Sequence, residues 1–204
     1  MSVGFFRPHV PLFVPPRWFE LYDADTLTLP QSPRSDLNDL PKNFLGINDY
    51  AVAPTHAQVV QHGKQRSLTH AYLASISFVD HCVGIVLEAL KSSPHAENTL
   101  IVFTSDQGFA WGQHGFRAKV APYDANIRGP LIMSFPGVIP PGGVCPSPVG
   151  GTDLPPTFFG FAGLKLPWKM HGHDLAPLLK KPGRRWEHPA LTILTGQSFG
   201  ADTD

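Results

Sequence analysis

A carboxylate and an amide follow an apolar run in the middle of the chain. Residues 100–103 are apolar, and Asp106, Gln107 and Gly108 come shortly after them. Carboxylate and amide oxygens suit a hard cation such as Ca²⁺, and an open α/β sheet binds its ligands beyond the carboxyl ends of its strands. Gly108 would permit the turn that lets neighbouring side chains share one ion. A plain turn capped by Asp106 is the alternative that this spacing leaves open.

Cationic side chains stand in two further loops. In "RPHVP", Arg7 and His9 lie in a proline-stiffened segment. Two rigidly held cationic donors suit a sulfate or phosphate ester, whereas the alternative is a surface loop with an incidental histidine. Lys119 follows the glycine-bounded turn "GQHG". By itself, it indicates only a solvated charge.

The remaining histidines and the cysteines give weaker signals. His114 lies inside "GQHG", where packing within the loop is favoured over ligation. His171 and His173 have the spacing of a zinc chelate, but no partner ligands are apparent, so the favoured interpretation is an ordinary turn. Cys82 and Cys145 form no paired metal or redox motif, and nothing requires them to form a disulfide.

The sequence also predicts the elements that must position these residues. Apolar residues recur at spacings of three and four over 64–91, which is typical of a helix. A second helix is expected near 154–162, with Thr152 or Asp153 as N-cap and Gly163 as its stop. We expect strands at 3–6, 100–103, 130–137 and 191–194, and one short helix at 55–62 within the irregular stretch 23–63. A helix followed by a buried strand is the alternation of an α/β protein.

Composition narrows the classes of function. The 204 residues are 42% hydrophobic and 16% charged, which indicates a globular domain rather than a disordered chain. The formal net charge is zero, which argues against a broad nucleic-acid surface. We expect no membrane span, because no run approaches 18 apolar residues, and no signal peptide at the N-terminus. Strands predicted at both ends favour a piece of a longer protein.

Four segments in a fixed order carry a resemblance to a known family. They are "VGFFRPHVPLFVPPRWFELYD", "YLASISFVDHCVGIVLEAL", "NTLIVFTSDQGFAWGQHGFRAKVAPYDANIRGPLI" and "GTDLPPTFFGFAGL". Together they resemble the C-terminal-side part of a sulfatase catalytic domain, in the iduronate- and choline-sulfatase-like branch of the alkaline-phosphatase-like superfamily. The resemblance implies an α/β fold, a partial mixed sheet flanked by helices. It also implies that residues 1–204 form one partial catalytic domain without the N-terminal nucleophile segment.

The resemblance assigns roles to residues of this chain. Asp106 matches the family's metal-binding aspartate at the strand end, and Gln107 matches the metal ligand beside it, with an amide oxygen in place of histidine or asparagine. Lys119 matches the lysine that touches the sulfate, and His9 matches the substrate-side histidine. These two are the expected catalytic residues. Arg7 stands where close relatives have lysine, which keeps the charge but changes its shape. One Ca²⁺ is the implied cofactor.

Two family features have no match in the chain. One is an acidic metal-binding pair near the first strand. The other is the Cys- or Ser-x-Pro-x-Arg motif whose first residue becomes the formylglycine nucleophile; the nearest matches, at 92–96 and 145–147, depart from it. The expectation is a calcium-dependent hydrolase of small-molecule or glycan sulfate esters that is inactive as this chain alone. The alternatives are a phosphodiesterase or phosphonate hydrolase of the same superfamily, or a truncated copy without activity.

Overall fold

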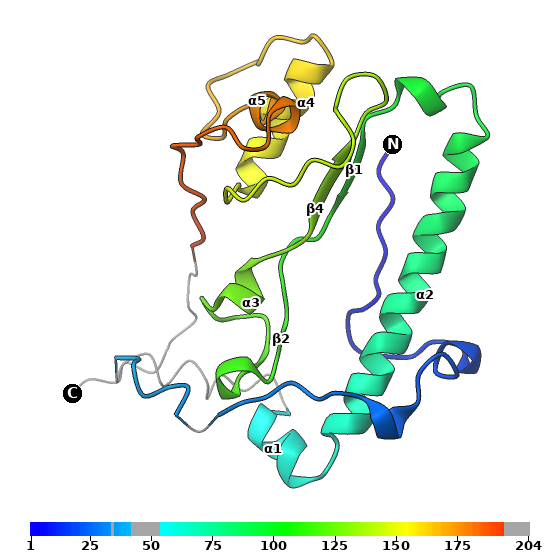
Figure 1. Ribbon diagram of the computed structural model, residues 1–204, viewed down its shortest axis with the longest axis vertical. Helices are drawn as coiled ribbons and strands as arrows, with labels where there is room; N and C mark the ends of the chain where they lie inside the picture. Colours follow the sequence, from blue (N-terminus) through cyan, green and yellow to red (C-terminus); the bar gives the residue numbers. More distant parts are fainter. Residues whose placement is uncertain (34, 42–53, 194–204) are drawn as a thin grey trace. The chain divides into compact units, whose positions relative to one another are not determined.

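The computed structural model describes residues 1–33, 35–41 and 54–193. They divide into two compact units (Figure 1). The first unit comprises Met1–Ala96 and Phe109–Lys119, and the second comprises Glu97–Gly108 and residues 120–193. Each unit is described by itself below.

The first unit is built around one long helix. Its elements are η1 (Pro16–Trp18), η2 (Ala24–Thr26), α1 (His56–Gln61), α2 (Gln65–Lys91), β2 (Ala110–Trp111), η5 (Gln113–Gly115) and β3 (Arg117–Ala118). α2 confirms the helix predicted over 64–91, and α1 confirms the short helix predicted at 55–62. α1 begins with a capping box, because Gln58 N–H donates to the Thr55 hydroxyl and Thr55 N–H donates to the Gln58 side chain.

The N-terminal segment of this unit is fastened to α2 by polar contacts. The Arg66 guanidinium donates to the carbonyl oxygens of Ala24 and Leu27, at 2.7 and 3.2 Å. His70 Nε2 lies 2.9 Å from the Phe19 carbonyl oxygen. Figure 1 shows η1 and η2 beside the first half of α2. Side chains of the helix therefore satisfy backbone groups that have no partner in a regular element.

α2 leaves much of its apolar surface exposed. Ile85 is 59% exposed and Leu87 is 41% exposed. The mean hydropathy of its most apolar stretch is 1.6, so by length and composition α2 is the one helix in the described part of the chain that qualifies as a membrane span. This differs from the expectation that no segment qualifies. A single such helix is weak evidence for a span, because core helices of soluble proteins pass the same test.

The second unit combines a two-stranded sheet with short helices. Its main elements are β1 (Ile101–Thr104), α3 (Asp124–Ile127), β4 (Leu131–Ser134), η6 (Gly151–Asp153), α4 (Leu154–Phe161) and α5 (Ala176–Lys180). β1 and β4 confirm the strands predicted at 100–103 and 130–137, and they pair antiparallel, with Ile101 opposite Ser134 and Thr104 opposite Leu131.

The prediction that β1 is a buried strand is wrong for the described residues. Phe103 on β1 is 41% exposed, and Ile132 on β4 is 61% exposed. β4 is the only strand that pairs with β1 in the part of the chain that the structure describes. A two-stranded sheet cannot cover both of its own faces, so an apolar strand in it stays partly exposed.

Two further predicted strands do not form. Residues 3–6 and 191–193 have no strand conformation, and Leu194 lies outside the described residues. Neither segment pairs with another described segment, and apolar composition alone does not make a strand, because a strand needs a partner for its backbone groups. The irregular stretch 23–63 agrees with the prediction where it is described; residue 34 and residues 42–53 lie outside that part.

A buried carboxylate organises the helical part of the second unit. Asp153 accepts hydrogen bonds from Gly150 N–H and His173 N–H, both at 2.8 Å. The Thr157 hydroxyl donates to the Asp153 carbonyl oxygen and accepts from Leu175 N–H. Asp153 occupies the predicted N-cap position of α4, but its side chain caps η6 instead.

The far end of α4 agrees with the sequence. The helix ends at Phe161, and Gly163 follows with a φ of +66°. Glycine adopts this left-handed conformation without steric cost, which confirms its predicted role as the stop of the helix.

Candidate functional site

Asp106 and Gln107 lie in the turn that follows β1. The strand ends at Thr104, and Asp106 is exposed while Gln107 is half-buried. The Ser105 hydroxyl lies 2.8 Å from the Gln107 carbonyl oxygen, to which it donates, and 3.4 Å from Asp106 Oδ1. Both side chains therefore follow the carboxyl end of a strand, as predicted, although that strand is not buried.

The turn is held by close approach of its backbone to α3. Gly108 N–H donates to the Asn126 carbonyl oxygen at 2.8 Å. A Cβ on Gly108 would lie 2.3 Å from the Ala125 carbonyl oxygen and 2.5 Å from that of Arg128. Gly108 is not among the glycines with positive φ. The glycine is thus required for space, and not for the turn conformation that the sequence suggested.

The donor chemistry of this turn fits a hard cation in part. Asp106 offers a carboxylate and Gln107 an amide oxygen, which are ligands that Ca²⁺ accepts. Ca²⁺ takes about 6–8 oxygens. Within the described ranges, no group of three or more histidine, cysteine, aspartate or glutamate side chains is placed to hold a metal. The two side-chain oxygens of this turn are therefore far fewer than a Ca²⁺ ion takes.

Lys119 follows a short hairpin of the first unit. β2 and β3 pair antiparallel, with Ala110 opposite Ala118 and Trp111 opposite Arg117. Lys119, directly after β3, is half-buried. Because it adjoins the paired strand, the position of its backbone is set by the hairpin.

The loop of the hairpin is fixed by contacts with an earlier segment. His114 N–H donates to Asp36 Oδ2 at 3.0 Å, and the His114 ring lies 3.2 Å from the same oxygen. Gly115 N–H donates to the Ser32 hydroxyl at 2.9 Å. His114 thus packs the loop, in agreement with the interpretation favoured by the sequence.

Aromatic side chains brace the hairpin from the side of α2. The Trp111 ring stacks on Tyr72 with centroids 4.5 Å apart, and its indole N–H donates to the Thr69 hydroxyl at 2.8 Å. The Arg117 guanidinium lies over the Trp111 ring at 4.8 Å and over Phe109 at 6.0 Å. Cation–π contacts of this kind strengthen when they are removed from water.

Burial shifts the titration of the groups in this brace. It lowers the pKa of His56, and the nearby positive charge of Arg117 lowers it further. It also lowers the pKa of Arg117 and raises the pKa of Tyr72. A Cβ on Gly112 would lie 2.7 Å from His56 Cε1, so the histidine packs directly on the hairpin backbone. The neutral form of His56 is therefore favoured.

The residue before Lys119 has an unusual backbone. Ala118 is buried and has a φ of +139°, a value that non-glycine residues rarely adopt. Such strain persists only where the surroundings determine the conformation, and it concentrates at functional sites. The strained residue stands immediately before the proposed sulfate ligand.

Arg7 and His9 share the N-terminal loop. Arg7 Nε donates to the Phe13 carbonyl oxygen at 3.0 Å, and its Nη1 donates to the His9 carbonyl oxygen at 3.3 Å. His9 is exposed, and its Nδ1 lies 2.7 Å from the Val10 carbonyl oxygen. Since a carbonyl oxygen can only accept, Nδ1 carries the proton. Arg7 thus holds the loop, and Nε2 is the ring atom of His9 left for a ligand.

The structure groups the predicted site residues into three local sets. Arg7 and His9 share a loop, Asp106 and Gln107 share a turn, and Lys119 follows a hairpin. Sequence reasoning missed the brace behind Lys119, formed by His56, Trp111 and Arg117. The alternation of aromatic and small residues in "GFAWG" was the one available signal, because it is typical of a strand with one face packed.

Solved structures of known proteins share the fold. A phosphonate monoester hydrolase from Silicibacter pomeroyi matches with a TM-score of 0.76 at 30% identity, covering 89% of this chain and 37% of that protein. The protein BT4656, solved in complex with its substrate D-glucosamine-2-N,6-O-disulfate, matches with a TM-score of 0.56 at 37% identity, covering 59% of this chain and 24% of that protein. These likenesses confirm the predicted partial α/β fold of the alkaline-phosphatase-like kind.

Sequence relatives agree with the structures. A protein named Sulfatase from Formosa agariphila is 38% identical over 181 residues, or 89% of this chain and 36% of the relative. Iduronate 2-sulfatase of Mus musculus is 34% identical over 164 residues, or 76% of this chain and 29% of the relative. The chain spans about a third of the length of these relatives. The family model described as Sulfatase matches residues 1–164, and on these grounds the chain belongs to the sulfatase family.

Proposed function

We propose that this chain forms the sulfate-binding side, and part of the cation-binding side, of a sulfuric ester hydrolase. The observation that carries the proposal is the placement of Lys119. It follows a hairpin that is braced by buried aromatic side chains, and this hairpin lies within the stretch matched by the sulfatase family model. A half-buried lysine on a rigid support is suited to hold one oxygen of an anion.

Lys119 and His9 have complementary roles in the proposal. Charge develops on the sulfate oxygens and on the leaving oxygen as the S–O bond breaks, and fixed cationic donors stabilise that charge. The ammonium of Lys119 would bind one sulfate oxygen. Nε2 of His9 would face the ester, because Nδ1 is engaged by the Val10 carbonyl oxygen. Arg7 would act by holding the loop that presents His9.

Asp106 and Gln107 would hold the cation of the intact protein. When bound, Ca²⁺ supplies a Lewis acid that neutralises charge on the ester oxygens. The contribution of this chain is two oxygen ligands on a turn whose position is set by the contact of Gly108 with α3. Two oxygens are far fewer than Ca²⁺ takes, so we expect the isolated chain to bind Ca²⁺ only weakly.

The substrate class follows from the relatives. BT4656 was solved with a sulfated glucosamine as its substrate, and we propose a small-molecule or glycan sulfate ester for the intact protein of which this chain shows the sulfatase part. The 204 residues contain no Cys- or Ser-x-Pro-x-Arg motif. Loss of a nucleophile costs several orders of magnitude in rate. We therefore expect residues 1–204 alone to hydrolyse aryl sulfates no faster than background.

Sulfate binding tests the proposal directly. Inorganic sulfate, added to the isotope-labelled chain with chloride as the ionic-strength control, should shift the backbone amide resonances of Lys119 and His9. Lys119→Gln should remove the response, whereas Lys91→Gln should leave it unchanged, because Lys91 is an exposed lysine on α2. Equal responses to sulfate and chloride at Lys119 would contradict the proposal.

An activity assay separates the enzyme from the alternatives. A chromogenic sulfate ester with a calcium titration should show no turnover by the purified chain. Robust turnover abolished by Asp106→Ala would mean that a nucleophile lies within these residues, and it would refute the expectation of inactivity. No sulfate response in the binding experiment would instead favour a copy without activity.

A phosphonate monoester hydrolase is the second candidate. It is favoured by the TM-score of 0.76 with such an enzyme. The same cationic side chains suit either ester, because sulfate and phosphonate monoesters are both tetrahedral oxyanions. A competition between inorganic sulfate and methylphosphonate for the Lys119 resonance discriminates the two. Tighter binding of methylphosphonate would favour the second candidate.

A further inference from the structure

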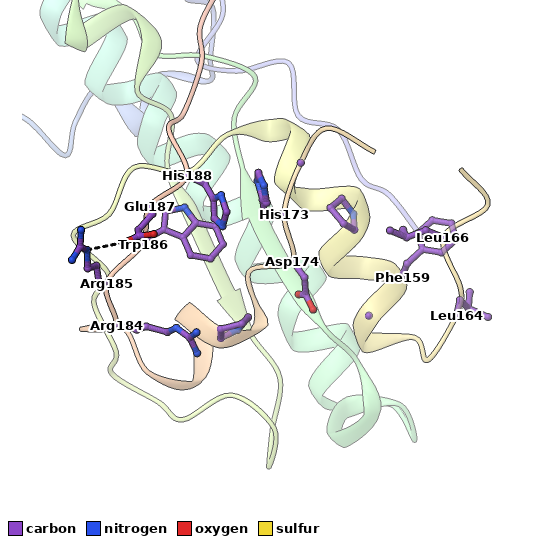
Figure 2. A pocket seen from close by; sticks show the side chains of 14 residues that line it. Phe159, Leu164, Leu166, His173, Asp174, Arg184, Arg185, Trp186, Glu187 and His188 are labelled. Atoms are coloured by element: carbon purple, nitrogen blue, oxygen red, sulfur yellow. Dashed lines mark ion pairs between the residues drawn. The ribbon is translucent and has the colours of Figure 1, made fainter. Parts of the chain in front are cut away.

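The second unit contains an open pocket that the proposed function does not use. It lies among α4, α5 and residues 184–188 and has a volume of about 880 Å³ (Figure 2). Ligand pockets in proteins typically measure about 300–1,000 Å³. None of its lining residues belongs to the proposed site of Asp106, Gln107, Lys119 and His9. The lining of the pocket is therefore separate from that site.

One wall of the pocket is aromatic. His173 and His188 stack with ring centroids 3.6 Å apart at 16°. The Trp186 ring stands nearly perpendicular to both, with its centroid 4.7 Å from His188 and 6.1 Å from His173. Figure 2 shows these three side chains grouped on one side of the pocket. They form a continuous surface of ring faces and edges.

This wall is held by the buried carboxylate of Asp153. The carboxylate accepts from His173 N–H at 2.8 Å, and His173 Nδ1 lies 3.7 Å from the same oxygen. A Cβ on Gly172 would lie 1.8 Å from the Thr152 carbonyl oxygen, so only glycine fits before His173. The backbone that carries His173 is thus fixed before any ligand arrives, which lowers the entropic cost of binding.

Another part of the pocket lining is apolar, and the rim is polar. Phe159, Leu164 and Leu166 are also lining residues, and Figure 2 shows them on the other side of α4 from the aromatic group. Asp174 accepts from Ala176 N–H through Oδ1. Arg184 is exposed, and no ion pair to it occurs among the residues that the structure describes.

The two charged side chains next to Arg184 in this segment form an ion pair with each other. Arg185 Nε lies 3.0 Å from Glu187 Oε1, so these two side chains pair with each other. The rim therefore presents Arg184 as a cation without an ion-pair partner in the described part, together with the carboxylate of Asp174. Donors, acceptors and apolar surface occur side by side within one pocket.

This combination selects one class of ligand. A purely apolar ligand would leave Arg184 and Asp174 without a role, and a bare inorganic anion would be repelled by Asp174. A sugar ring has apolar faces for the aromatic wall and hydroxyl groups that both donate and accept. An anionic substituent on that ring would pair with Arg184. We propose that the pocket binds an anionic sugar unit of a glycan.

The inference rests on the proposed function for the choice of a sulfated rather than a carboxylated sugar. The probe is therefore D-glucosamine 6-sulfate, with D-glucosamine and inorganic sulfate as comparison ligands. All three are titrated into the isotope-labelled 204-residue chain, and the indole N–H resonance of Trp186 is followed after its assignment with Trp186→Phe. Glucosamine 6-sulfate should shift this resonance saturably, and inorganic sulfate should not.

Variants test how much individual side chains contribute to ligand binding. Arg184→Ala should weaken the binding of glucosamine 6-sulfate about tenfold, because one charge-assisted contact is lost. The weaker binding of glucosamine should stay unchanged. Lys181→Ala removes an exposed lysine that does not line the pocket and should change neither. Lys119→Gln should also leave the Trp186 response unchanged. The pocket is thus tested separately from the sulfate site, so that the two proposals can fail independently.

Three results would overturn the inference. The first is no shift of the Trp186 resonance at millimolar glucosamine 6-sulfate. The second is an equal response to inorganic sulfate, which would indicate an ion site without sugar recognition. The third is an unchanged affinity in Arg184→Ala while thermal denaturation shows that the variant is folded.

Discussion

The hairpin before Lys119 and the turn that contains Asp106 are fixed in different ways. Side chains brace the hairpin, because Trp111 stacks on Tyr72 and Arg117 lies over the Trp111 ring. Backbone contact holds the turn, because Gly108 approaches the carbonyl oxygens of α3 more closely than any side chain would permit. Both regions follow short strands, but only the hairpin is supported by buried aromatic residues.

The difference indicates which substitutions each region tolerates. A braced hairpin loses stability when a large side chain is removed, since a cavity remains. A turn held by backbone contact loses stability when a methyl group is added, since the neighbouring carbonyl groups cannot move aside easily. The hairpin before Lys119 and the turn that contains Asp106 are therefore vulnerable to opposite changes in side-chain volume.

Removing Trp111 should have the largest effect. Trp111→Ala deletes the stack on Tyr72 and the hydrogen bond to Thr69, and we expect a loss of about 3–5 kcal/mol in the free energy of unfolding. Urea denaturation followed by circular dichroism measures it. Trp168 is 68% exposed, so Trp168→Ala should stay within about 0.5 kcal/mol of the unmodified chain. Equal losses in the two variants would mean that the hairpin is not braced by Trp111.

Adding one methyl group to the turn should rank second. Gly108→Ala places a Cβ against the carbonyl oxygens of Ala125 in α3 and of Arg128 just after it, and we expect a loss of about 1–3 kcal/mol in the free energy of unfolding. Gly151→Ala is the matched control in the same unit, because nothing lies within 4 Å of its Cβ position. Denaturant midpoints of the two variants give the comparison. A tolerated Gly108→Ala would show that the turn is free to move away from α3.

Acid should weaken the hairpin through His56. Its pKa is lowered in the folded chain, so the unfolded state binds the proton more readily. The stabilisation is present above the ordinary pKa of about 6.5 and is lost as the pH falls through the folded value. Thermal unfolding measured from about pH 8 to pH 5 should show this decline. His56→Gln should flatten it, whereas a variant of the exposed His62 should not.

The smallest effect should come from a matched pair across the hairpin. Ala110 and Ala118 are opposite each other and both are buried, but only Ala118 has a positive φ. Ala110→Gly should cost about 0.5–1 kcal/mol. Ala118→Gly should cost less, because relief of strain offsets the lost methyl group. If Ala118→Gly is the more damaging change, the backbone before Lys119 is not strained.

The long helix and the strand ends could be predicted from the sequence because they depend on local signals. The apolar spacing over 64–91 predicted α2, and Gly163 predicted the end of α4. The partial exposure of β1 could not be predicted, because it depends on which strands pair with it. The role of Gly108 was missed for a similar reason. Glycine is required at position 108 because α3, about 17 residues later in the chain, lies against it, and not because of the conformation of its own turn.

The prediction of the site was limited in the same way, because contacts between segments that are distant in the sequence could not be predicted. The residue types of Asp106, Gln107, Lys119 and His9 left plainer interpretations open, and only the resemblance to sulfatases led to the prediction of a cation-and-sulfate site. The sequence did not reveal that Arg7 is engaged with backbone carbonyl oxygens, because that contact depends on how the loop closes. The pocket beside Trp186 was also not predicted, since its aromatic wall combines residues from two separate segments, at 173 and at 186–188.

The central proposal is that Asp106 and Gln107 supply oxygen ligands to a cation, and that Lys119 and His9 supply donors to a sulfate group. Mn²⁺ prefers oxygen ligands as Ca²⁺ does, and it broadens the nuclear magnetic resonance signals of nearby nuclei. Titrated into the isotope-labelled chain, it should broaden the amide signals of Asp106 and Gln107 first. Asp106→Ala should abolish the effect. Broadening that leaves Asp106 and Gln107 sharp, or that centres on His173 and His188, would contradict the account.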